Sequence, residues 1–107
     1  MVSSVNDLFA TIRGNPFIDG LGYFVELETS KPVTADDVAQ LTEQMQFDFC
    51  QHAKAELDGS HVLGLDFHDH VETIGADAKY YLQAMERILL GVEAKFGITH
   101  LCVEFQF

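Results

Sequence analysis

Tryptophan is absent from this chain of 107 residues, and cysteine and proline occur only twice each. Two cysteines are too few for the disulfide framework of a small secreted protein, and Cys50 and Cys102 lack the spacing of a zinc finger. Both cysteines lie in segments whose pattern indicates regular structure. We therefore expect buried, reduced thiols and a cytoplasmic protein.

Positive charge is also scarce. Six Lys and Arg residues stand against 17 Asp and Glu residues, which gives a formal net charge of -11 at pH 7. Direct binding to nucleic acid needs many cations along the phosphates, and docking on anionic lipid needs a basic surface. The composition thus argues against nucleic acid and against a membrane as direct partners.

Long apolar runs, secretion signals and catalytic motifs are missing as well. No run approaches the roughly 20 apolar residues of a membrane-spanning helix. The first residues lack the basic start and apolar stretch of a secretory signal. Gly20 and Gly22 lead into a predicted strand, so they do not form a phosphate loop. No nucleophile is matched with a base, which favours a non-enzymatic role and leaves an enzyme open.

The composition that is present belongs to one globular domain. Forty-eight percent of the residues are apolar and 21% are charged. A chain of this length has the common size of a single compact domain. We expect residues 1–107 to fold as one unit.

The periodicity of the apolar residues predicts helices and strands in turn. Apolar residues recur every three or four positions in the helical segments, and they alternate with polar ones in the strands. Thr34 caps the first long helix, and Asp58-Gly59 is interpreted as its end. The expected elements are a short helix from Ser4 to Gly14, a strand over 21–29, a helix over 34–57, a strand over 61–74, a helix over 76–96 and a strand over 98–107.

This order predicts an α+β two-layer sandwich. A sheet of three or four strands would carry the two long helices on one face, with a short N-terminal helix added. The segment 61–74 is either one long strand or a hairpin that turns near residues 68–70. The hairpin would give the βαββαβ order of the ferredoxin-like arrangement. In either case the second face of the sheet is left open.

Acidic residues dominate the polar positions of the strands, and this pattern carries the leading functional hypothesis. Sites that bind phosphates are basic, so an acidic surface is attracted to them and can occupy them. We therefore expect a non-enzymatic inhibitor, of the immunity or anti-defence type, that neutralises a basic protein such as a nuclease. The candidate contact residues are Phe24, Glu26, Glu28, Asp66, Glu72 and Glu104 on the sheet, and Asp36, Asp37, Phe47 and Asp48 on the first long helix.

A second hypothesis rests on histidines. His68 and His70 are two residues apart on the predicted strand, and His100 lies on the polar face of the last strand. Imidazole groups bind zinc and other first-row divalent metals. The alternative is therefore a small metal- or ligand-binding dimer, with or without enzymatic activity. Phe24 among acidic residues is also compatible with a homodimer that forms through the open sheet face. A further alternative is that this face is simply exposed to solvent, which is common in such folds.

Overall fold

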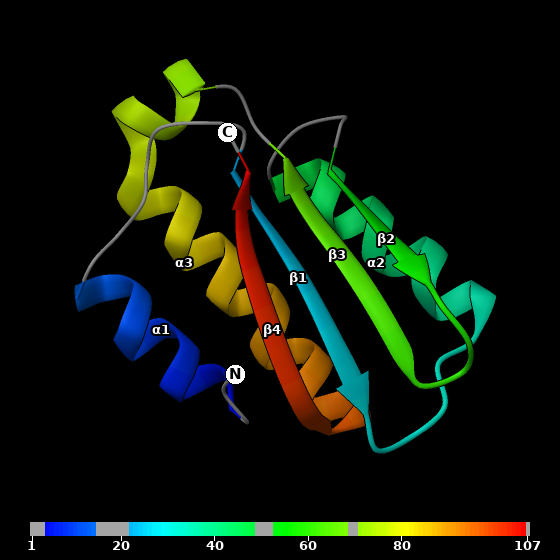
Figure 1. Ribbon diagram of the computed structural model, residues 1–107. Helices are drawn as coiled ribbons and strands as arrows, with labels where there is room; N and C mark the ends of the chain where they lie inside the picture. Colours follow the sequence, from blue (N-terminus) through cyan, green and yellow to red (C-terminus); the bar gives the residue numbers. More distant parts are fainter. Residues whose placement is uncertain (1–3, 15–21, 49–52, 69–70, 107) are drawn as a thin grey trace.

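The computed structural model describes residues 4–14, 22–48, 53–68 and 71–106 (Figure 1). Within these residues the fold is α+β, in two layers, as the sequence predicts. The elements in chain order are α1 (Val5–Gly14), β1 (Gly22–Thr29), α2 (Ala35–Asp48), β2 (Lys54–Leu57), β3 (Val62–His68), α3 (Val71–Phe96) and β4 (Ile98–Gln106).

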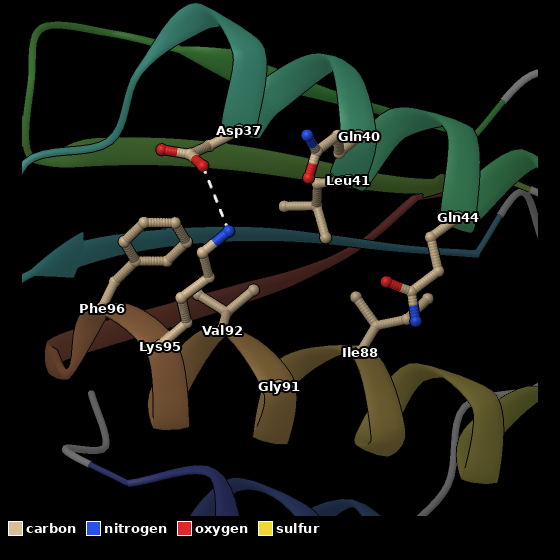
Figure 2. A pocket seen from close by; sticks show the side chains of 9 residues that line it. All are labelled: Asp37, Gln40, Leu41, Gln44, Ile88, Gly91, Val92, Lys95 and Phe96. Atoms are coloured by element: carbon tan, nitrogen blue, oxygen red, sulfur yellow. Dashed lines mark hydrogen bonds and ion pairs between the residues drawn. The ribbon is translucent and has the colours of Figure 1, made fainter.

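The four strands form one antiparallel sheet in the order β2-β3-β1-β4. Strand β1 is central and pairs with both β3 and β4. The order β1-α2-β2-β3-α3-β4 is consistent with the ferredoxin-like arrangement. Helices α2 and α3 both cover the same face of the sheet, and α1 flanks α3 on the side away from α2 (Figures 1 and 2).

The core lies between the sheet and the helices. Strand β1 contributes every second residue, and the same alternation holds in β3. From the helices, α1 adds Val5, Leu8 and Phe9, whereas α3 adds a stripe at helical spacing. The largest fully buried side chains are Val5, Phe9, Leu27, Met45, Leu63, Leu65, Phe67, Met85, Ile88, Leu89 and Leu101.

The helix caps follow from the sequence. At α1, the Ser4 hydroxyl oxygen accepts a hydrogen bond from the Asp7 N–H at 3.2 Å. At α2, Asp37 N–H donates to the Thr34 hydroxyl at 3.2 Å, and Thr34 N–H donates back to the Asp37 carboxylate at 3.0 Å. These reciprocal bonds satisfy N–H groups that a helix start leaves unpaired.

The middle of the chain differs from the sequence prediction. Helix α2 ends at Asp48 and not at Leu57, and residues 54–57 form the edge strand β2. The turn is Asp58-Gly59: Gly59 has φ +86°, and the Asp58 N–H donates to the Val62 carbonyl at 2.9 Å. Asp-Gly between two alternating segments is a hairpin signal, which explains why the chain reverses there.

The next boundary is also earlier than predicted. Strand β3 ends at His68, and α3 begins at Val71, so the segment 61–74 is neither one strand nor a hairpin. The apolar alternation of Leu63, Leu65 and Phe67 stops at Asp69, which lies outside the described residues. Val71, Ile74 and Ala78 instead have the spacing of a helix.

Gly97 ends α3 with φ +72°, a conformation that residues with a Cβ rarely adopt. A Cβ atom at this position would also lie 2.9 Å from the Ser30 Oγ. We expect Gly97→Ala to lower the free energy of unfolding by about 1–2 kcal/mol, the usual penalty for a left-handed residue. Urea denaturation measures this change.

Gly91 offers the matched control, because it is also a glycine of α3 but sits inside the helix with open space around an added Cβ. Gly91→Ala should raise the free energy of unfolding by about 0.5–1 kcal/mol. Equal effects of the two substitutions would contradict the assigned helix end.

Candidate functional site

The face of the sheet opposite α2 and α3, which no described helix covers, presents side chains from all four strands. Successive residues of a strand point to opposite faces, so the residues between the core positions gather here. The strand pairing places them in three cross-strand rows: Glu104, Phe24, Asp66 and Lys54; Cys102, Glu26, Gly64 and Glu56; and His100, Glu28 and Val62.

The charge of this face is strongly negative. Among the described side chains it carries five carboxylates, of Glu26, Glu28, Glu56, Asp66 and Glu104, and two groups that can be cationic, of Lys54 and His100. We call this set, together with Phe24, the acidic sheet face.

Lys54 and His100 each already lie beside a carboxylate of the acidic sheet face. Lys54 Nζ lies 2.9 Å from Glu56 Oε1, and His100 Nδ1 lies 3.1 Å from Glu28 Oε2. The hydrogen bond to Glu56, followed by the charges of Glu56 and Asp66, raises the pKa of Lys54 above its ordinary value. Within the described residues, no ion pair joins Glu26 or Glu104 to a cation of the chain.

Phe24 adds an aromatic ring to the acidic sheet face, in the row of Glu104 and Asp66. Its half-buried ring lies against Gly64, where a Cβ atom would be only 3.0 Å from Phe24 Cζ. Phe24, Glu26, Cys102 and Glu104 border a shallow depression of about 160 Å³. An aromatic ring among carboxylates is a favourable environment for a cationic side chain, because the ring face and the carboxylates both attract positive charge.

The structure brings together most of the predicted sheet residues but not all of them. Phe24, Glu26, Glu28, Asp66 and Glu104 share the uncovered face, as expected. Glu72 does not, because it lies in the first turn of α3 and not on a strand.

The thiol prediction is corrected for one cysteine. Cys102 is free and exposed on the acidic sheet face, because it occupies an outward position of β4. Cys50 lies outside the described residues.

The sheet does not bring together His68 and His100, the two candidate metal ligands that the structure describes. His68 pairs with Gly22, and Gly22 pairs with Gln106 on the other side of β1. His100 is six residues from Gln106 along β4, which is about 20 Å of strand. His68 and His100 therefore lie at opposite ends of the sheet, and His70 lies outside the described residues.

The predicted helix residues lie on the other side of the molecule. Asp36 and Asp37 are in the first turn of α2, and Asp48 is its last residue. Phe47 is 90% exposed near the end of the same helix. These residues belong to the helical layer and not to the acidic sheet face.

The helical layer contains a groove between α2 and α3 (Figure 2). It has a volume of about 170 Å³. At one end Lys95 Nζ lies 3.1 Å from Asp37 Oδ1, so the two charges neutralise each other. The groove is lined by Asp37, Gln40, Leu41, Gln44, Ile88, Gly91, Val92, Lys95 and Phe96.

Sequence reasoning missed the contribution of β2 to the acidic sheet face. Lys54 and Glu56 point to this face because β2 pairs with β3 through Lys54–Asp66 and Glu56–Gly64. Their alternation with Ala55 and Leu57, followed by Asp58-Gly59, was the available signal.

None of the described residues forms a cluster of three or more His, Cys, Asp or Glu side chains that could hold a metal ion. Nor does any helix in that part of the chain have the length and hydropathy needed to cross a bilayer. No family model matches the chain, and the comparisons with curated proteins and with solved structures give no match either.

The Thr34–Asp37 cap predicts how the stability of the fold depends on pH. Hydrogen bonds from the Thr34 N–H and hydroxyl, and then the Lys95 ammonium, lower the pKa of Asp37 below 3.8. The ionised carboxylate therefore stabilises the fold above that pH, and this stability is lost as the pH falls through the folded-state pKa. Asp37→Asn should lower stability at pH 7, and its difference from the wild type should shrink in acid.

Urea denaturation across the acidic range tests this. Asp36→Asn is the control, because Asp36 lies in the same turn but outside the Thr34–Asp37 pair. A difference between Asp37→Asn and the wild type that stays constant into strong acid would refute the assignment.

Proposed function

We propose that this chain is a non-enzymatic binding protein whose acidic sheet face binds a basic protein. In its concrete form the partner is a nucleic-acid-processing protein such as a nuclease, which the chain inhibits. The observation that carries the proposal is the excess of carboxylates on the acidic sheet face: Glu26, Glu28, Glu56 and Glu104 are exposed, and Lys54 and His100 each already lie beside one of them.

The carboxylates of the acidic sheet face indicate which chemical groups the partner should present. A site that binds phosphates is rich in Lys and Arg, and carboxylates can stand where the phosphates would lie. Glu104 and Asp66 share one row but stand two strands apart, which is about 9.6 Å in the pairing direction, and Glu26 and Glu28 are two residues apart on β1, which is about 7 Å. Long-range attraction speeds the encounter, and charge complementarity fixes the orientation.

Phe24 adds an aromatic contact to the interface, which the charged side chains do not provide. Fully exposed ion pairs contribute little binding free energy, whereas an aromatic side chain near the centre of an interface often contributes most. The Phe24 ring is half-buried and lies over Gly64, so part of its apolar surface is left for a partner to cover.

The same charges oppose a homodimer through this face. Two copies placed face to face would bring ten described carboxylates together, because each acidic sheet face has five. Like charges across such a contact are destabilising. We therefore assign the face to a basic partner, in the cytoplasm, where Cys102 stays reduced.

A matched pair of variants tests the proposal. Glu26→Gln/Glu104→Gln and Asp36→Asn/Glu43→Gln both remove two exposed charges, the first from the acidic sheet face and the second from α2. The partner is identified by native mass spectrometry of the protein purified from its source, and its association rate is measured by surface plasmon resonance. We expect the first variant to slow association about tenfold and the second to change it little.

Two further readouts belong to the same experiment. Association should slow as the salt concentration rises, because screening weakens the attraction. The captured protein should lose its activity on nucleic acid when the chain is bound. Equal rates for the two variants, or full activity of the captured protein in the complex, would refute the proposal.

A further inference from the structure

The outer edge of β4 is a second surface with the properties of an interface. Strand β4 is last in the sheet order, is nine residues long, and pairs on one side only within the described residues. It contains neither Lys nor Pro, which commonly protect sheet edges. The opposite edge, β2, has only four residues and carries the charges of Lys54 and Glu56.

The hydrogen bonding of β1 shows which groups of β4 point outward. Thr29 N–H donates to the His61 carbonyl at 2.8 Å, so the odd-numbered residues of β1 bond toward β3. The even-numbered residues of β1 consequently bond toward β4, where their partners are His100, Cys102 and Glu104. The backbone N–H and C=O groups of Leu101 and Val103 are therefore directed away from the sheet.

We propose that two copies of this chain pair antiparallel through their β4 edges, about a two-fold axis at Cys102, and form a continuous eight-stranded sheet. In this register Leu101 of one copy exchanges hydrogen bonds with Val103 of the other. Cys102 lies opposite Cys102 of the second copy, and His100 lies opposite Glu104. The outward backbone groups are thus satisfied, and His100, which lies beside Glu28 of its own chain, gains Glu104 of the second copy as a further acidic neighbour.

Other registers fit less well. An axis at Val103 would set Cys102 opposite Glu104 and leave His100 without an acidic neighbour in the second copy. An axis at Glu104 would oppose two carboxylates directly. A shift by one residue in the pairing would turn the apolar side chains of one copy to the polar face of the other.

The helical layer extends toward the β4 edge of the sheet. Helix α1 flanks α3 on the side of β4 (Figure 1), and Val5 N–H donates to Glu93 Oε2 of α3 at 3.2 Å. Under the proposed two-fold axis, α1 of each copy lies beside the joined β4 strands, on the helical side of the sheet. The pairing leaves the acidic sheet face of both copies uncovered and does not depend on the proposed function.

Disulfide mapping of the unmodified protein is the direct test. Residues opposite each other in a non-hydrogen-bonded antiparallel pair have Cα atoms about 4.5 Å apart, within the range that a disulfide spans. Mild oxidation with copper–phenanthroline should give a cross-linked dimer, and peptide mass spectrometry should place the bond between the two Cys102 residues. Analytical ultracentrifugation under reducing conditions should show twice the mass of one chain.

A proline variant tests the backbone pairing. Val103→Pro removes an outward N–H without costing a bond to β1, because proline is tolerated on the free side of an edge strand. The symmetric dimer loses two hydrogen bonds, so its dissociation constant should rise at least about tenfold. Val103→Ala keeps the N–H and should dimerise as the wild type does.

Three results would overturn the proposal. These are a monomer at all concentrations, an oxidised dimer linked through any pair other than Cys102–Cys102, and a folded Val103→Pro variant that dimerises like Val103→Ala. Circular dichroism establishes whether the proline variant is folded. If it is not, the disulfide map of the unmodified protein decides the question.

Discussion

The structure depends on the pairing of β1 with a strand on each side. Because β1 is central, its alternation fixes which residues of β3 and β4 point to the core and which to the outside. Tyr23, Val25 and Leu27 are buried under the helices, whereas Glu26 and Glu28 are exposed. One strand thus provides both the centre of the hydrophobic core and the centre of the acidic sheet face, and a shift of one residue would exchange the two.

The fold class was accessible from the sequence because its main signals are local. Apolar periodicity located β1, β4, the first part of β3 and α3 except for its first turns, and Thr34 marked the start of α2. Strand β2 was not found, because four residues following a long helical stripe carry little periodic signal. Its conformation is decided by pairing with β3, and the turn at Asp58-Gly59 brings the two together. Asp-Gly is common both in hairpin turns and after the last residue of a helix, and the second interpretation was chosen for Asp58-Gly59.

The site was accessible only in part. Alternation alone assigned Phe24, Glu26 and Glu104 to one face, and the register then placed them side by side. Alternation could not tell that His68 and His100 end up at opposite ends of the sheet, since the register depends on how separate strands pair. Glu72 was assigned to a strand because the local sequence did not show that β3 ends at His68 and that α3 begins at Val71.

The contact between Phe24 and Gly64 has an evolutionary consequence. The Phe24 ring can lie close to the sheet because Gly64, on the neighbouring strand, has no side chain. A methyl group at position 64 would lie 3.0 Å from Phe24 Cζ. The two positions are therefore not free to drift independently. In descendants of this sequence, a larger residue at position 64 should be accompanied by a smaller or differently shaped one at position 24. Such correlated substitutions would reveal the contact between positions 24 and 64 from sequences alone.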